Sequence, residues 1–543
     1  MEADRQRLRQ APEQPWVEIA LLKRRIFVAK AERVDTTQLE LEFKDKLAQL
    51  DALAGTSEMP PAEPDDDDGK RARAKPKGRR RVEDMPLPEE RIEISDPEFE
   101  ALVEQGQAER IGFEESYKLA WQRSGARRLV VARVKYRTVD PDGESALETT
   151  PVPPQLFPRS LAAVSMLAHV LVSKFNDGLP FHRMEEILGR SGVTLDRGTM
   201  CRWAEDAGAT LGATIVEAMR RDALSNAFCI ACDGTGIAVQ PVRRADKKRQ
   251  ACRRGHYFAM IADASHIWFE YSARDTSDNV KAMFKDFAGY VQVDAKSTFD
   301  VLFRDGPPGK PEPDDPRDDV DRPPVRLEVA CWAHARRKYW EAALARSVTA
   351  REALARIARI FELDALWKGK PPAMISQQRN AHLRPHVAAF LSWAEAEYEK
   401  VKGQRGPLRS ALGYTVRQKD ALARFLDDGR LKLDNNRSEL ALRGRVAVGR
   451  KAWLFVGSDD HAQSATGIMS LIASARLHRL DPETYLRDVL RVLPHWPRDR
   501  YLELSPLHWA ATRARLDGDE LARELGALTV PLPPPPQEQP QPN

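Results

Sequence analysis

The first fifty residues carry apolar side chains with the period of an α-helix. Leu39, Phe43, Leu47 and Leu50 follow one another at steps of three or four residues, which places them on one face of a helix. We therefore expect an N-terminal helical arm over residues 1–54. Such an apolar face suits a short coiled coil or dimer arm, and it equally suits a helix that packs against its own domain.

A second helical pattern covers residues 151–222 and resembles a helix-turn-helix. An amphipathic helix is followed by a turn, and Asp196 or Thr199 can cap the helix that comes next. Arg197 and Arg202 belong to this second helix, and we expect them to contact DNA. Two helices joined by a turn also occur in proteins that bind no DNA, so this alternative stays open.

From residue 226 onward the pattern changes to short apolar runs, rich in β-branched and aromatic residues, which predict strands. Three such runs lie within residues 226–299, with a helical stretch at 278–288 between the second and the third. A further strand at 326–333 leads directly into a helix. This order predicts an α/β sheet, into which the helical residues 345–428 are inserted.

Changes of pattern along the chain predict its domains. Strand character at 127–137 indicates a small mixed module, and a helix is expected at 482–492. The predicted parts are the helical arm (1–54), a charged linker (55–92), the small mixed module (93–150), the helix-turn-helix-like region (151–222), the first part of the α/β core (223–344), the helical insertion (345–428), the second part of the core (429–492) and a C-terminal extension with a Pro-rich tail (493–543).

Composition excludes several classes of protein. Five cysteines in 543 residues argue against a disulfide scaffold and favour a reducing cytoplasm. The longest apolar stretch, 161–172, is too short to cross a bilayer, which takes about 20 residues, and the charged N-terminus is unlike a secretory signal. We therefore expect a cytoplasmic protein without a membrane partner.

The net charge is small but unevenly distributed. The chain has 85 Lys and Arg against 81 Asp and Glu, a net charge of +4, which by itself identifies no partner. Residues 69–81, however, contain eight Lys and Arg and no acid, a composition typical of segments that contact DNA phosphates. The candidate contacts there are Lys70, Arg71, Arg79, Arg80 and Arg81. The alternative is a solvated linker whose charge is offset by the acidic run at 65–68.

Three acidic residues stand out by their positions. Asp233 and Asp294 each end an apolar run, and Glu439 falls in a stretch that Asn435 or Asn436 can cap as a helix. Carboxylates at the ends of neighbouring strands, with one from an adjacent helix, can converge on Mg²⁺ or Mn²⁺. Aspartate also favours strand-end turns, so the three acids alone are weak support for catalysis. We expect the glycines at 234 and 236 to form a tight turn.

Five motifs, in order, resemble those of the insertion sequence 66 family of transposases. They are ACDGTG, GYVQVDAKSTF, CWAHARRKYWEA, LDNNRSELALR and GRKAWLFVGS. The resemblance implies an α/β fold of the DDE class, with an RNase H-like catalytic core that carries a large helical insertion. By this resemblance Asp233, Asp294 and Glu439 are the catalytic acids, and they hold Mg²⁺ or Mn²⁺, as two ions.

The resemblance also implies partners and an activity. The expected partner is double-stranded DNA, both the terminal inverted repeats of the insertion element and the target. A homodimer or larger assembly, accessory proteins of the same element and a nucleoid-associated location follow from the same resemblance. The implied activity is cutting at element ends and joining of the 3′-hydroxyl to target DNA. The alternatives are a non-cutting DNA-end-binding or repressor protein, and a metal-dependent nuclease without strand transfer.

Basic residues near the acids are further candidates for DNA contact. They are His334, Arg336, Arg337 and Lys338 on one predicted helix, and Arg443, Arg450 and Lys451 around Glu439. A solvated helix face is the alternative for the first group. Trp453 and Phe455 can stack on an unpaired base or pack in the core.

The sequence lacks the residues of a zinc site that is common in the family. The family commonly has four zinc-binding cysteines before its helix-turn-helix region, whereas residues 93–150 contain none, so we expect no zinc there. Cys229 and Cys232 have the spacing of a zinc motif, but strand residues three apart face opposite sides of a sheet. We therefore expect both to be packing residues.

Overall fold

The structure, a computed structural model, describes the chain from residue 87 to residue 534 with several gaps. The described residues are 87–122, 125–139, 145–241, 251–303, 325–435 and 452–534, together with Val82, Met85, Ala441 and Val446. By its internal contacts the chain divides into two units, Met1–Gly78 and Arg79–Asn543. All described residues lie in the second unit. The predicted N-terminal arm and most of the predicted linker lie outside them.

The first sheet is built around a long hairpin. Its strands are β1 (Glu89–Ile94), β2 (Ala108–Gln122), β3 (Gly125–Val139) and β4 (Ser145–Thr149), with helix α4 at Pro97–Glu104. β1 pairs with β3 in parallel, whereas β2 and β4 pair with β3 in antiparallel orientation. The strand expected at 127–137 is confirmed as part of β3. The predicted boundary between residues 92 and 93 falls inside β1, because β1 is paired into this sheet.

The helix-turn-helix-like region consists of helices, as predicted. These are α5 (Val164–Phe175), α6 (Phe181–Arg190), α7 (Arg197–Leu211), a π-helical turn (Gly212–Val216) and α8 (Glu217–Asn226). Asp196 is the residue that caps α7, since its Oδ1 accepts a hydrogen bond from the Gly198 amide at 2.8 Å. The predicted domain boundary at residue 222 lies within α8.

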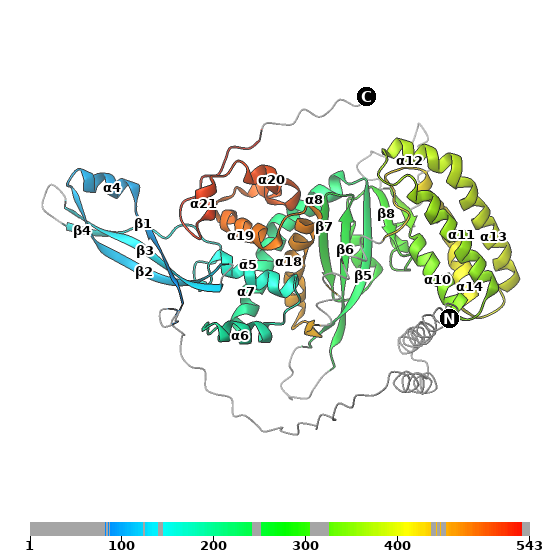
Figure 1. The fold of residues 1–543 in the computed structure, drawn as a ribbon, viewed down its shortest axis with the longest axis horizontal. Helices are drawn as coiled ribbons and strands as arrows, with labels where there is room; N and C mark the ends of the chain where they lie inside the picture. The colour runs from blue at the N-terminus through cyan, green and yellow to red at the C-terminus, as the bar shows by residue number, and fades with distance from the viewer. Residues whose placement is uncertain are drawn as a thin grey trace, which may run out of the picture. The chain divides into compact units, whose positions relative to one another are not determined.

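The second sheet has five strands in the order β7-β6-β5-β8-β9. The strands are β5 (Cys229–Val239), β6 (Arg253–Ala262), β7 (His266–Ser272), β8 (Gly289–Val293) and β9 (Arg326–Ala330), with α9 at Ser277–Met283 before β8. β5, β6 and β7 are antiparallel neighbours, and β8 and β9 join β5 in parallel. Figure 1 shows β5 to β8 side by side. The predicted mixed α/β class is thus confirmed.

β5 is longer than the sequence indicated. It continues through Asp233 to Val239, paired with β6 over its whole second half. The expected tight turn at Gly234 and Gly236 is therefore wrong. A residue without a Cβ is needed at position 234, because the ring of Phe258 on β6 lies across it. A Cβ there would come within 3.0 Å of Phe258 Cε1.

Helices dominate the chain from residue 332 to residue 426, as expected for the insertion. They are α10 (Trp332–Leu344), α11 (Val348–Ala365), α12 (Pro372–Gln378), a π-helical turn (Arg379–Leu383), α13 (Arg384–Val401), α14 (Pro407–Arg417) and α15 (Lys419–Ala423). They form a hydrophobic core of their own around Trp332, Ile357 and Phe390. Arg379 is buried and donates to the carbonyls of Phe425 and Leu431, which ties the end of the insertion back to its middle.

The chain after residue 458 supports both the second sheet and the helix-turn-helix-like region. Its helices are α18 (Asp459–Leu477), α19 (Pro482–Val492), α20 (Pro506–Arg513) and α21 (Gly518–Ala522), and α19 has the bounds that the sequence predicted. α18 packs against β7 and α7. The hydroxyls of Ser470 and Ser474 accept from the amides of Phe269 and Ile267 on β7, so α18 satisfies the hydrogen-bonding groups of this edge strand.

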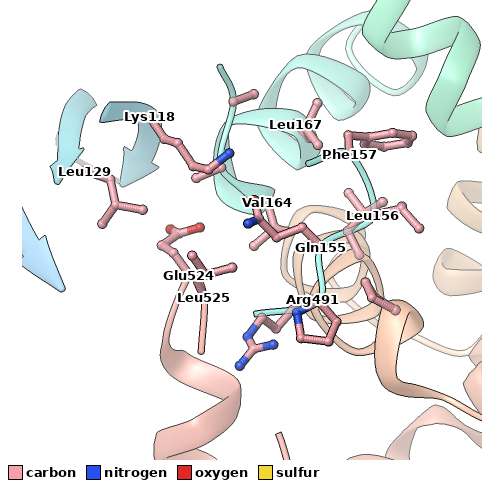
Figure 2. A pocket seen from close by; sticks show the side chains of 15 residues that line it. Lys118, Leu129, Gln155, Leu156, Phe157, Val164, Leu167, Arg491, Glu524 and Leu525 are labelled. Atoms are coloured by element: carbon pink, nitrogen blue, oxygen red, sulfur yellow. The ribbon is translucent and has the colours of Figure 1, made fainter. Parts of the chain in front are cut away.

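The C-terminal extension is joined to the first sheet by buried charges. Figure 2 shows Lys118, Glu524 and Arg491 around a cavity of about 30 Å³, enough for a water molecule. Glu524 pairs with Arg127 at 3.0 Å and accepts from the Ser165 amide at 3.1 Å. Burial lowers the pKa of Lys118. Within the described part of the chain, no helix is both long and apolar enough to span a membrane.

Candidate functional site

The second sheet brings two of the three predicted acids together. β5 and β8 pair in parallel with Ala231 opposite Gln292. If that register is continued by two residues, Asp233 lies opposite Asp294, which directly follows the last residue of β8. Neighbouring strands are about 4.8 Å apart. On that register the two half-buried carboxylates lie on the same face of the sheet.

Backbone amides orient both carboxylates. Asp233 Oδ1 accepts from the Gly234 amide at 2.8 Å, and Asp294 Oδ1 accepts from the Lys296 amide at 3.2 Å. Ala295 lies between the last two with a φ of 56°, so the chain turns sharply away from the sheet after Asp294. The Lys296 ammonium pairs with Asp275 instead of Asp294. Within the described ranges no basic side chain forms an ion pair with Asp294.

Two cysteines lie on β5 near the acids. Cys232 is completely buried next to Asp233. Burial raises the pKa of its thiol well above the usual value, and the charges of Asp233, Glu270 and Asp294 raise it further. Burial likewise raises the pKa of Cys229 to about 12. Both thiols are therefore protonated packing groups near neutral pH, in the role that the sequence predicted.

The chain segment that leads to Glu439 is bound to the same end of the sheet. The Gln292 side chain on β8 donates to the Lys432 carbonyl at 2.8 Å, and the Trp332 amide donates to the Leu433 carbonyl at 3.1 Å. Asn435 is 1% exposed, and its Nδ2 donates to the Cys232 carbonyl on β5 at 3.0 Å. Residues 432–435 therefore cross the sheet edge beside both acids.

Sequence reasoning missed this role of Gln292 and Asn435. It interpreted Asn435 as a helix cap and did not consider Gln292. A buried amide inside an apolar strand is a signal that could have indicated a partner, since buried polar groups are almost always hydrogen-bonded. The partner itself could not be inferred, because it lies 140 residues away.

The two predicted DNA contacts on α7 are accessible. Arg197 and Arg202 are exposed, and Arg202 Nη2 donates to the Thr199 hydroxyl at 3.1 Å. This bond is within one turn of the same helix. Both guanidinium groups therefore lie at the surface of α7, where a phosphate can approach them.

The predicted contacts on α10 have different surroundings. They are His334, Arg336, Arg337 and Lys338. Lys338 Nζ lies 5.1 Å from the ring centre of Tyr414, and the Arg336 guanidinium lies 6.0 Å from that of Phe361. Arg337 forms an ion pair with the glutamate one turn further on, at 3.5 Å. Helices of the insertion thus approach two of these cations, while His334 is half-buried in the first turn after β9.

The remaining candidate residues lie outside the described residues. These are Glu439, Arg443, Arg450, Lys451, Lys70, Arg71, Arg79, Arg80 and Arg81. The described residues contain no group of three or more His, Cys, Asp or Glu that could hold a metal ion.

The two aromatic residues near the start of the last described segment differ from each other. Trp453 packs edge-on against Phe175, with ring centres 5.6 Å apart, as the core alternative predicted. Phe455 is 44% exposed, and Leu454 between them is 69% exposed. Only Phe455 therefore has an aromatic face available to a ligand.

Comparison with known proteins gives the same family along most of the chain. The family model described as Transposase IS66 family matches residues 159–464, and the one described as IS66 C-terminal element matches residues 470–507. A third, described as Transposase C of IS166 homeodomain, matches residues 16–94.

Curated relatives come from Sinorhizobium fredii and are described as uncharacterized. The protein y4jD is 27% identical over 91% of this chain and 94% of its own length. The protein y4qI is 27% identical over 77% of this chain and 75% of its own length. No solved structure matches the chain significantly.

Proposed function

The chain belongs to the IS66 family of transposases, and from that premise we propose that it cuts DNA at the ends of its insertion element and joins the freed 3′-hydroxyl to target DNA. The observation that carries the proposal is the parallel pairing of β5 with β8 up to Ala231 and Gln292, each two residues before one of the acids Asp233 and Asp294. The strand order, three antiparallel strands followed by two parallel ones, is the order expected of an RNase H-like catalytic core.

Glu439 is the proposed third acid, and the length of the chain supports this. It follows Asn435 by four residues, and Asn435 is bonded to the carbonyl next to Asp233. Four extended residues span at most about 14 Å. The chain between Asn435 and Glu439 is therefore short enough for the Glu439 carboxylate to be directed at Asp233 and Asp294.

The donor set fits a divalent cation. Asp233, Asp294 and Glu439 offer only carboxylate oxygens, the ligands that Mg²⁺ and Mn²⁺ prefer, and the Lys296 ammonium is held by Asp275. When bound, two such ions stabilise the charge on the attacking and leaving oxygens of a phosphoryl transfer. The protein contributes rigid carboxylates on paired strands, which fix where the reacting phosphate lies.

Basic residues of the chain would hold the DNA backbone. Arg197 and Arg202 are exposed on α7, and the basic run at 69–81 and Arg443, Arg450 and Lys451 add charge along the sequence. Phosphate contacts of this kind orient DNA without identifying its sequence. Binding should therefore weaken steeply as salt is added. As a transposase that joins two ends, the protein would act as a dimer or larger assembly, with accessory proteins of its element.

The test is cleavage and joining of DNA that carries the native element ends, in Mg²⁺ and with the proteins of the same element present. Asp233→Asn removes one metal-binding charge at nearly constant shape, and we expect it to lower both activities at least about 1,000-fold while DNA binding is retained. Asp278→Asn, at an exposed position on α9, is the matched control and should be fully active.

Three outcomes would contradict the proposal in different ways. Unchanged activity of Asp233→Asn would remove Asp233 from the site. Ends that are bound but never cut by the unmodified protein would indicate a DNA-end-binding or repressor protein. Cut ends without any joined product would indicate a nuclease that lacks strand transfer.

A further inference from the structure

An aromatic cavity lies apart from the paired acids, between the helix-turn-helix-like region and the segment that precedes α18. It has a volume of about 110 Å³ and its lining includes Lys174, Phe181, Cys201, Glu205, His461, Trp453 and Phe455. Lys174 comes from α5, Cys201 from α7, and the last two from the segment before α18. The family motifs and the catalytic proposal give this cavity no role.

One hydrogen-bond donor in the cavity has no acceptor among the described residues. The Lys174 ammonium lies over the rings of Trp453 and Phe181, at 4.1 and 4.3 Å from their centres, and makes no hydrogen bond or ion pair with any residue that the structure describes. Burial lowers its pKa to about 8. A ligand in the cavity that supplies an acceptor would therefore gain a hydrogen bond from this ammonium.

The mouth of the cavity is formed by a strained turn. The Phe455 amide donates to the Trp453 carbonyl at 2.8 Å, and Leu454 between them has a φ of 68°. A three-residue turn with positive φ is rare and strained, and strain of this kind gathers at functional sites. The turn leaves Phe455 44% exposed.

This turn is fixed to the catalytic sheet. The Val456 amide donates to the Ala238 carbonyl, and the Gln240 amide donates to the Val456 carbonyl, both at 2.8 Å. Ala238 is five residues beyond Asp233 on β5, at most about 17 Å along an extended strand. A ligand at the mouth would therefore be held at a set distance from the acids, away from the reacting phosphate.

We propose that this cavity binds one unpaired nucleobase, which stacks on Phe455 and accepts a hydrogen bond from Lys174. Every base has a flat face for stacking and ring nitrogens or carbonyls as acceptors, and the exposed Arg202 on α7 can contact a phosphate. Arg202 follows Cys201 on α7, and Arg450 and Lys451 come shortly before Trp453 in the sequence. A paired base is excluded because its edge and both faces are occupied within the duplex.

This inference rests on the proposed function, since it names a subsite for the same DNA. The experiment compares the affinity of the full chain for a single-stranded oligonucleotide of the element end with its affinity for the corresponding duplex. Phe455→Ala should weaken single-strand binding roughly 10-fold, the loss expected for one stacked base, and should change duplex binding less than about twofold. Phe455→Trp should restore single-strand binding.

The matched control is Phe113→Ala, which removes a phenylalanine of similar exposure, 39%, from β2 and should change neither affinity. A 2-aminopurine base in the single strand gives a second measurement. Its fluorescence should fall when the unmodified protein binds, because the base then stacks on an aromatic ring, and it should change much less with Phe455→Ala.

The proposal is overturned if Phe455→Ala leaves single-strand binding unchanged or weakens single-strand and duplex binding equally. The two proposals fail separately. If the unmodified protein cuts and joins element ends but Phe455→Ala has no selective effect, only the base subsite is wrong. If the selective effect is present but the unmodified protein never cuts, the subsite stands and the catalytic proposal is wrong.

Discussion

The two sheets of this protein are stabilised in different ways. In the sheet of β1–β4, most side chains of β1, β4 and the outer part of β2 are exposed or half-buried, and ion pairs such as Arg133–Glu114 at 2.5 Å cross its strands. In the sheet of β5–β9, large apolar side chains such as Phe258 and Phe269 are almost completely buried. Helix α18 covers its edge strand.

This difference explains where the candidate acids lie. Exposed ion pairs contribute at most about 1 kcal/mol each, so they hold the exposed strands of the first sheet only weakly. On the second sheet, buried apolar side chains of β5 and β6 hold the backbone that carries Asp233. The second sheet is therefore the part of the molecule that can hold two like charges next to each other.

The largest expected contrast between the sheets comes from removing one phenylalanine from each. Phe258→Ala should lower the free energy of unfolding by about 3–5 kcal/mol, because it leaves a cavity against Gly234 and Phe299. Phe113→Ala, on the first sheet, should cost under about 1 kcal/mol because its side chain is 39% exposed. Urea denaturation followed by circular dichroism measures both. Equal losses would show that the first sheet is also held by apolar packing.

A smaller effect is expected from a buried acid at the edge of the second sheet. Burial raises the pKa of Glu328 on β9 to about 7, with the charge of Asp300 adding to the shift. The native protein therefore binds a proton that the unfolded chain releases near pH 4.5, and stability should fall as the pH rises from about 4.5 to 7.

The Glu328→Gln side chain has no proton to lose, so the stability of this variant should not fall between about pH 4.5 and 7. We expect it to be more stable than the unmodified protein by roughly 2 kcal/mol at pH 8 and equally stable near pH 4. Thermal or urea unfolding at the two pH values is the measurement. A stability difference that does not depend on pH would refute the titration and indicate a packing effect.

The smallest effect is expected from the ion pairs of the first sheet. Glu114→Ala removes the partner of Arg133 at a position where Glu114 is 51% exposed. Stability should fall by less than about 1 kcal/mol, and the loss should shrink further in 1 M salt because the pair is screened. Unfolding at low and high salt tests this, and a loss above about 2 kcal/mol would contradict the proposed contrast between the sheets.

The sequence predicted most of the secondary structure but not the extent of β5. Apolar runs indicated the strands and the helical insertion, and the helix at 482–492 was predicted with its observed bounds. Asp233 followed by two glycines suggested a strand end, since Gly and Asp favour turns. The structure continues the strand instead, because β6 pairs with it as far as Val239 and the Phe258 ring fills the space that Gly234 leaves open.

The cationic residues of α10 also show what sequence patterns cannot predict. Helical spacing placed Arg337 and Lys338 on one face with His334, but spacing along one helix does not reveal which helices pack against it. In the structure, Lys338 lies over Tyr414 of α14, while Arg337 pairs along its own helix. Their environments therefore differ although they are adjacent in sequence.

By itself, the sequence determined the family, the order of strands and helices, and the three candidate acids, because these depend on local patterns and on motifs that can be compared directly. Only the tertiary structure decided which residues meet. It paired β5 with β8 up to Ala231 and Gln292, two residues before Asp233 and Asp294, bound Asn435 to the Cys232 carbonyl and enclosed Lys174 among aromatic rings. Each of these contacts joins residues distant in the chain, and contacts of that kind depend on packing of the whole fold, which local patterns do not encode.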